Sequence, residues 1–256
     1  MKIVVCIKQV PDSEAKIALQ AGRVSWGESP LVINPFDEYA VEAALQLRES
    51  PGAEVIAVSM GPESAREALK HALAMGADGA VLVSDPALEE LDSQAAARLL
   101  AGVIEKIGAV DLVIFGRQSI DSSTGLTTAQ TARVLNWPML ALAGSIRIDA
   151  AKITVERVME EGKQTISATM PAVVSVVQGI GEPRYPSFMG IRKAAKAVIP
   201  VWGLADLGVN VPAVVVRRVE LFSPPARSTE CEMISAGTLE EAAGMLADKI
   251  LAEKVL

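Results

Sequence analysis

The sequence has little material for metal-based or histidine-based chemistry. Its 256 residues include one histidine, His71, and two cysteines, Cys6 and Cys231, which are far apart along the chain. A zinc site or a histidine acid–base centre needs several such side chains at a recognisable spacing. Two isolated cysteines also give no disulfide framework, so we interpret both as inert small residues. We expect neither a metal centre nor a disulfide-stapled fold.

The common catalytic motifs are also missing. The chain has no Walker A, HExxH or GxSxG sequence, and no Gly-rich dinucleotide fingerprint follows its first apolar run. The short sequence Gly179-Ile180-Gly181 is interpreted as a turn. Without the fingerprint and its acidic ribose ligand, an NAD-dependent dehydrogenase is disfavoured. We therefore identify no candidate catalytic residues.

Net charge and hydropathy exclude two further classes of partner. The net charge is −7 at pH 7, which disfavours nucleic acid as a ligand. The one basic cluster, Arg184 with Arg192, Lys193 and Lys196, is interpreted as solvated surface. No apolar run approaches the roughly 18 residues that span a bilayer. Because Met1 leads straight into an apolar strand, we predict a cytoplasmic protein, with a processed organellar one as the alternative.

Short apolar runs alternate with segments of helical period in the first half of the chain. The apolar runs are residues 3–7, 54–59, 79–83 and 111–115, and the helical segments are 37–47, 63–74 and 92–107. This alternation is typical of βαβ units in a parallel sheet. Since the runs VVCI, VIAV, VLV and LVIF are apolar throughout, helices should cover both sheet faces. The predicted fold is α/β, with a doubly wound, mostly parallel sheet.

Other patterns predict additions to this core. Two alternating pieces at 16–19 and 23–26 favour a small hairpin around Gly22. Longer alternating strands at 141–148, 151–158 and 164–177 indicate an antiparallel edge. After the breaker-rich linker 223–230, residues 238–256 place apolar side chains on one helical stripe. We therefore expect a domain at 1–222, followed at 223–256 by a linker and a C-terminal helical arm.

Four polar pieces converge at the carboxyl ends of the predicted strands, where open α/β sheets bind ligands. They are residues 6–12, 34–37, 59–62 and 116–124. The last piece leaves its strand through Gly116 and enters a helix predicted near residues 125–134, whose free amides would form a phosphate cradle. The alternative is that Asp121, Ser122 and Thr124 only cap that helix. The residues alone leave both open.

The segment 179–190 has no helical or strand period and should be an exposed loop. Phe188 and Met189 are neighbouring apolar residues in it, with basic residues nearby. Such a pair on an exposed loop can mark a protein contact surface.

Several separated motifs together resemble the electron-transfer flavoprotein β subunit family. They are KIVVCIKQVPD, INPFDEYAVEAALQLRE, VIAVSMGPESAREALKHALAMGAD, DLVIFGRQSID and PAVVSVVQGIGEPRYPSFMGI. They occur in the family's order over roughly residues 1–222. The resemblance implies an adenine-nucleotide-binding, Rossmann-like domain in a heterodimer whose α subunit holds the working FAD, while the β chain usually binds AMP. It also implies an electron carrier subunit that is not itself an enzyme.

The resemblance also implies two sets of site residues. The nucleotide contacts would come from Cys6, Asn34, Pro35, Phe36, Asp37, Met60, Gly116, Arg117, Gln118, Ser119, Ile120, Asp121, Ser122, Ser123, Thr124, Gly125, Leu126 and Thr127. The partner-docking contacts would come from Glu182, Pro183, Arg184, Tyr185, Phe188, Met189 and Ile191. Phe188 occupies the position whose apolar side chain inserts into donors of the acyl-CoA dehydrogenase type. The implied electron acceptor is a membrane quinone oxidoreductase, and the C-terminal helix would dock on the α subunit.

One departure from the family pattern leaves the nucleotide open. Many relatives have acidic residues and a glutamine after the Ile-Asp pair, whereas this chain has Ser122-Ser123-Thr124-Gly125. Electron-bifurcating relatives resemble this chain but bind a second FAD in place of AMP and oxidise NADH. The sequence LNWPM at 135–139 looks nearer to the AMP type. A further alternative is a stand-alone nucleotide-binding sensor without flavin partners.

Overall fold

The computed structural model describes residues 1–20, 22–49, 52–88, 91–210, 213–223, 225 and 231–253. The chain forms two compact units, Met1–Leu221 and Phe222–Leu256. The first carries the sheet and all of the predicted site residues. Most of the predicted linker 223–230 lies outside the described residues.

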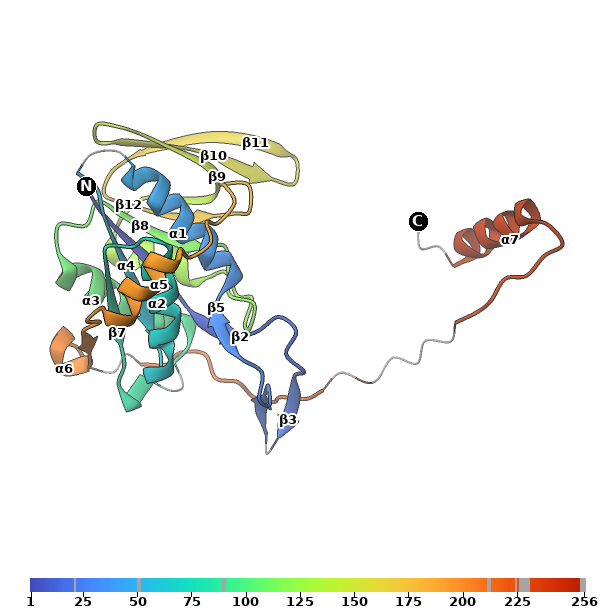
Figure 1. Cartoon of the computed structure of the whole chain (residues 1–256), viewed down its shortest axis with the longest axis horizontal. Helices are drawn as coiled ribbons and strands as arrows, with labels where there is room; N and C mark the ends of the chain where they lie inside the picture. The colour runs from blue at the N-terminus through green and yellow to red at the C-terminus, as the bar shows by residue number, and fades with distance from the viewer. Residues whose placement is uncertain are drawn as a thin grey trace. The chain divides into compact units, whose positions relative to one another are not determined.

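The first unit is built on a nine-stranded sheet in the order β11-β10-β9-β12-β8-β1-β6-β7-β13 (Figure 1). The strands are β1 (Lys2–Ile7), β6 (Glu54–Met60), β7 (Gly79–Val83), β8 (Leu112–Gly116), β9 (Met139–Asp149), β10 (Lys152–Met159), β11 (Gly162–Thr169), β12 (Ala172–Val176) and β13 (Val201–Trp202). Neighbouring strands from β9 to β13 in this order are parallel, and β9, β10 and β11 are antiparallel. The predicted α/β fold with an antiparallel edge is confirmed.

Helices cover both faces of the sheet. They are α1 (Pro35–Arg48), α2 (Arg66–Met75), α3 (Ser93–Ile107), α4 (Thr127–Leu135) and α5 (Phe188–Lys196), with a short α6 (Leu204–Leu207). Along β1, Ile3, Val5 and Ile7 face the core that contains α1 and α2, while Val4 and Cys6 face the core that contains α3 and α4. This alternation of faces is why the run is apolar at every position.

The predicted strand 164–177 is wrong as a single strand of the antiparallel edge. It is divided at Met170-Pro171 into β11, which lies at the sheet edge, and β12, which lies in the centre, parallel to β8 and β9. Proline has no amide to donate to a ladder, so the strand cannot run through Pro171. The sequence AVVSV, apolar except for Ser175 and buried at every position, is typical of a central parallel strand.

Smaller strands lie between β1 and α1. The predicted hairpin is confirmed as β3 (Ala18–Gln20) paired antiparallel with β4 (Arg23–Ser25). A second pair, β2 (Gln9–Pro11) with β5 (Leu31–Ile33), was not predicted. Single-turn 3-10 helices η1 (Glu63–Ala65) and η2 (Pro86–Leu88) follow β6 and β7. The β2–β5 pair brings the chain back to β1 just before α1 begins.

The predicted exposed loop 179–190 is wrong at its end, because α5 begins at Phe188. Ser187 caps this helix, and its hydroxyl accepts a hydrogen bond from the Gly190 amide at 3.0 Å. Pro186 and Gly190 hid the helical period in the sequence. Phe188, Met189 and Ile191 therefore stand on the first turn of a helix.

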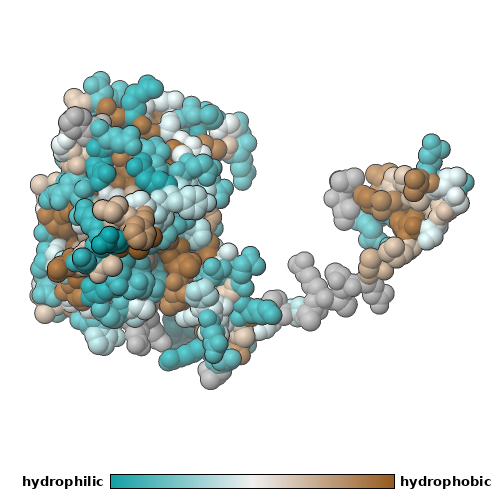
Figure 2. Space-filling model, in the orientation of Figure 1, coloured by the Kyte–Doolittle hydropathy of each residue, from teal (hydrophilic) through white to brown (hydrophobic). Residues whose placement is uncertain are grey.

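The second unit contains the helix α7 (Leu239–Ala252), which begins with a capping box formed by Thr238 and Glu241. None of its described residues is buried, and Leu239, Leu246 and Leu251 are exposed. Figure 2 shows apolar residues on the surface of this helix. Across the described ranges, no helix combines the length and hydropathy that a membrane span requires.

Candidate functional site

The candidate nucleotide residues gather at the carboxyl ends of three neighbouring strands. Cys6 lies near the end of β1, Met60 ends β6 and Gly116 ends β8. β1 lies between β6 and β8, and the chain runs from β1 to β6 and β7 on one side before it returns to β8 on the other. The chain therefore reverses direction across the sheet between β1 and β8. The carboxyl ends of these two strands form a topological switch point, where open α/β sheets bind ligands.

Asn34 joins the start of α1 to the loop after β8. Its side chain is 1% exposed and holds that loop from both sides: Nδ2 donates to the Gln118 carbonyl at 2.8 Å, and Oδ1 accepts from the Ile120 amide at 3.2 Å. The Asn34 amide itself donates to the Lys8 carbonyl at 2.8 Å. Asn34 precedes α1 but does not cap it with its side chain. Its amide group instead fixes the path of the loop.

Asp37, in the first turn of α1, is 7% exposed. Its Oδ2 accepts a hydrogen bond from the Lys8 amide at 2.8 Å. Burial raises the pKa of Asp37 to about 7, although hydrogen bonds from the Lys8 and Gly116 amides lower it. A Cβ atom at Gly116 would lie 2.5 Å from Asp37 Oδ1, so only glycine lets the helix start approach β8 this closely. Asp37 therefore ties the ends of β1 and β8 to α1.

Cys6 and Met60 lie beside this junction. Cys6 is 6% exposed, and burial together with the Asp37 carboxylate raises the pKa of its thiol far above the usual range. A thiol in this environment stays protonated and unreactive at neutral pH. Met60 is partly buried and packs against the core between the sheet and α3. Both side chains offer apolar surface rather than chemistry.

The loop from Arg117 to Leu126 is the most exposed part of the candidate site, and residues 121–126 are all exposed. A turn holds it together: the Ser123 amide donates to the Ser119 carbonyl at 2.9 Å, and the Ser119 and Ser122 hydroxyls are 2.8 Å apart. α4 starts at Thr127, and within the described residues no side chain caps it. The alternative that Asp121, Ser122 and Thr124 cap this helix is wrong. The first amides of a helix carry a partial positive charge.

Lys8 lies in the predicted piece 6–12 but was not named among the nucleotide contacts. It is the first polar residue after β1, and its Nζ pairs with Asp121 Oδ2 at 2.6 Å across the switch point. Burial alone would raise the pKa of Asp121, but hydrogen bonds from Lys8 and Ser119 and the Lys8 charge lower it. The pair puts a cation, 45% exposed at its side chain, beside the hydroxyl-rich loop. Its position directly after the first strand was the sequence feature that could have identified Lys8 as a site residue.

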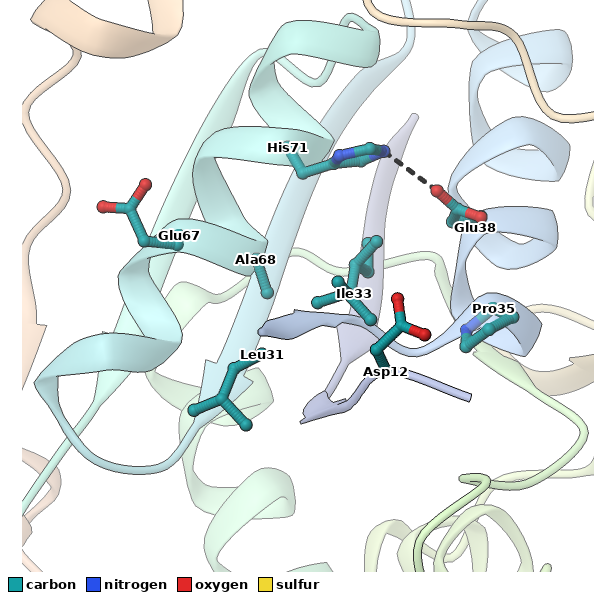
Figure 3. Close-up of a pocket in the computed structure, with 9 residues that line it drawn as sticks. Asp12, Leu31, Ile33, Pro35, Glu38, Glu67, Ala68 and His71 are labelled. Atoms are coloured by element: carbon teal, nitrogen blue, oxygen red, sulfur yellow. Dashed lines mark ion pairs between the residues drawn. The ribbon is translucent and has the colours of Figure 1, made fainter. Parts of the chain in front are cut away.

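Two hollows border this region. The smaller, of about 200 Å³, is lined by Phe36, Arg117, Val158, Val177, Gln178 and Gly179. The larger, of about 350 Å³, is shown in Figure 3 and is lined by Asp12, Leu31, Val32, Ile33, Pro35, Glu38, Glu67, Ala68 and His71. Three carboxylates surround the larger hollow, and its histidine is paired with Glu38 at 2.9 Å. An anionic ligand therefore suits the smaller hollow, where Phe36 and Arg117 belong to the predicted nucleotide set.

The predicted docking residues form a second region, at 182–191. Tyr185 is 95% exposed, Phe188 74% and Met189 71%, and Ile191 is also exposed. Arg184 differs from them, because its guanidinium pairs with the buried Glu42 of α1 at 2.8 Å. The segment thus presents apolar side chains outward while its one strong cation points inward. Neither Glu42 nor this pairing was predicted, although an acidic residue among the buried apolar positions of α1 was a signal.

The sequence LNWPM at 135–139 has a structural explanation. Asn136 ends α4 in the left-handed conformation, with φ 54° and ψ 37°, and Trp137 packs against the core. The Pro138 carbonyl accepts a hydrogen bond from the Val173 amide at 2.9 Å. These contacts end α4 and start β9.

Comparisons with known proteins agree with the resemblance in the motifs. Residues 27–207 match the family model described as "Electron transfer flavoprotein domain". The chain is 39% identical to the Caffeyl-CoA reductase-Etf complex subunit CarD of Acetobacterium woodii, over all of both chains. It is 34% identical to Electron transfer flavoprotein subunit beta of Megasphaera elsdenii, also over all of both chains. It is 40% identical to the subunit of that name in Mycobacterium tuberculosis, over 81% of each chain.

Proposed function

This chain belongs to the electron transfer flavoprotein β subunit family, and on that premise we propose that it is the nucleotide-binding β subunit of a heterodimeric electron carrier. An α-type subunit would hold the working FAD, which supplies the redox chemistry when bound. This chain would supply a nucleotide site, a docking surface and a C-terminal helix for the partner. The exposed apolar residues of α7 support the last of these roles.

The observation that carries the proposal is the convergence of Asn34, Asp37, Lys8 and the loop 117–127 at the switch point between β1 and β8. We propose AMP as the ligand, with its phosphate at the serine-rich loop and the start of α4. The uncapped first amides of α4, the hydroxyls of Ser122, Ser123 and Thr124, and the Lys8 cation suit a phosphate. The apolar surfaces of Phe36, Cys6 and Met60 suit the base. The nucleotide's role would be structural.

The segment 182–191 would dock electron donors of the acyl-CoA dehydrogenase type, and a membrane quinone oxidoreductase would accept the electrons. The exposed Tyr185, Phe188 and Met189 support a docking role, because an apolar or aromatic anchor within a polar rim is what an interface hot spot needs. Electron transfer from a donor to the partner's flavin requires no acid, base or nucleophile on this chain.

A second candidate function is supported by the similarity to a subunit of a Caffeyl-CoA reductase-Etf complex. In that case the same loop would bind a second FAD, and the heterodimer would split electrons from NADH between two acceptors. The departure at residues 122–125 from the acidic pattern of many relatives also supports it. In this variant of the function the chain would be part of an enzyme.

The loop after β8 can be tested by a charge change. The double substitution Ser123→Glu and Thr124→Glu places two carboxylates where the phosphate would lie, so electrostatic repulsion should release most of the nucleotide. Purified heterodimer would be denatured, and the released nucleotide would be measured by chromatography. The isosteric pair Ser123→Ala and Thr124→Val is the control and should retain more. Equal nucleotide content in the acidic variant and the native chain would contradict a phosphate site at this loop.

A further inference from the structure

The segment 182–191 is fixed to the first unit at points on both sides of its exposed residues. On its N-terminal side, Arg184 pairs with Glu42 of α1. On its C-terminal side, Ser187 caps α5, and a Cβ atom at Gly190 would collide with the Ala74 carbonyl at the end of α2. Tyr185, Phe188 and Met189 lie close to these attachments in the chain and remain exposed. The apolar surface is therefore held by its ends.

Arg184 donates three hydrogen bonds to the one buried carboxylate of Glu42. Nε donates to Glu42 Oε2 at 2.8 Å and Nη2 to Glu42 Oε1 at 2.9 Å, while the Arg184 backbone amide reaches Oε2 at 3.2 Å. Gln46 adds a hydrogen bond to Oε1 at 3.1 Å. This fork-to-fork geometry fixes direction as well as distance. The main chain at Arg184 is thereby set relative to α1.

The charges argue against Arg184 as a contact for a docking protein. Its Nη2 also lies 3.3 Å from Glu49 Oε1, so two carboxylates surround one cation. Glu42 is 4% exposed and would be left buried without its partner if Arg184 turned outward. Removing one member of a buried pair costs far more than a surface contact returns. Arg184 stays with Glu42 when a partner docks.

We propose that Glu42 and Arg184 are a positioning pair that holds the apolar surface of residues 185–191 in a docking-ready arrangement, and that neither touches the electron donor. The proposal rests on the proposed docking function of this segment. An interface that is ordered before binding loses less conformational freedom on association, so the pair would act on donor affinity rather than on electron transfer within the complex. Glu42 lies on α1, and Asn34, directly before the start of α1, holds the nucleotide loop.

The test compares variants of the heterodimer with an acyl-CoA dehydrogenase as the donor protein. Glu42→Gln and Arg184→Gln should each raise the KM for the dehydrogenase on the order of threefold to tenfold, with kcat unchanged. The double variant should be no worse than the poorer single one, because both remove the same pair. Glu49→Gln is the matched control: Glu49 meets the same guanidinium but is 68% exposed, so its loss should matter little.

A direct contact would give a different pattern: Arg184→Gln would raise the KM, whereas Glu42→Gln would leave it unchanged, and that result would overturn the proposal. Phe188→Ala tests the docking function itself, and an unchanged KM of this variant for the dehydrogenase would refute docking at this segment.

Amide hydrogen exchange in the heterodimer tests the positioning role independently. Glu42→Gln should speed exchange at residues 185–191 and Glu49→Gln should not. Equal exchange in the two variants would refute the pair's role.

Discussion

Asp37 shows how one buried carboxylate can organise the end of a sheet. Its carboxylate accepts from the amides of Lys8, which directly follows β1, and of Gly116, which ends β8, while the side chain belongs to the first turn of α1. The negative charge also lies at a helix N-terminus, which favours it. Burial outweighs these stabilising effects and raises the pKa of Asp37 to about 7. The native state therefore binds a proton at Asp37 more tightly than the unfolded chain does.

This raised pKa predicts the pH dependence of stability. An acid whose folded pKa exceeds its ordinary value of 3.8 contributes stability that is full below that value and is lost as the pH rises through about 7. The free energy of unfolding of the native chain should therefore fall between about pH 5 and about pH 8, relative to Asp37→Asn. Asp37→Asn removes this titration, and because its amide NH₂ faces a backbone donor, it also loses stability by an amount that does not depend on pH.

Denaturant unfolding of both chains at the two pH values measures that difference. The test is how the free energy of unfolding changes with pH. Its absolute value is not the test, because the substitution also disturbs hydrogen bonds. Parallel curves for the native chain and Asp37→Asn would show that Asp37 does not titrate in this range.

At the scale of elements, α1 is the helix that connects the two regions of interest. Its N-terminal end, with Asn34 and Asp37, holds the loops at the switch point. Glu42, farther along the helix, holds the segment 182–191. The buried apolar face of Ala40, Val41 and Ala44 fixes the helix against the sheet. A single rigid element thus sets the positions of both.

Asn34→Ala should loosen the loop after β8 without unfolding the domain. The substitution leaves the Ile120 amide and the Gln118 carbonyl without their partner, at a cost of about 1–3 kcal/mol for a buried group. Faster hydrogen exchange at the Ile120 amide and weaker nucleotide retention are expected. Ser122→Ala, which removes a hydroxyl pair on the exposed surface, is the control for the exchange measurement. An unchanged Ile120 exchange rate in Asn34→Ala would contradict this role.

The sequence predicted those elements whose pattern is local. β1, β6, β7 and β8 with their helices follow from apolar runs and helical periods, and the small hairpin follows from Gly22. The central position of β12 was missed because strand order depends on packing between distant segments. The start of α5 was hidden by Pro186 and Gly190, although Ser187 is a favoured N-cap. Lys8 with Asp121 and Glu42 with Arg184 are long-range pairs that no spacing reveals.

At the scale of the whole molecule, the described residues offer two kinds of surface. The sheet end with Lys8 and the loop 117–127 offers polar, partly cationic surface, whereas the segment 182–191 and α7 offer apolar surface. This division suits a subunit that holds a nucleotide and binds other proteins while a partner performs the redox chemistry.

The central claim is that this chain is a β subunit that holds an adenine nucleotide beside a flavin-bearing partner. The most direct measurement is to purify the chain with its α-type subunit, denature the complex, and count the released nucleotides by chromatography. The account predicts one FAD and one AMP for each heterodimer. Two FAD and no AMP would instead establish the electron-splitting function, and a chain that forms no complex with an α-type subunit and releases no nucleotide would contradict the account.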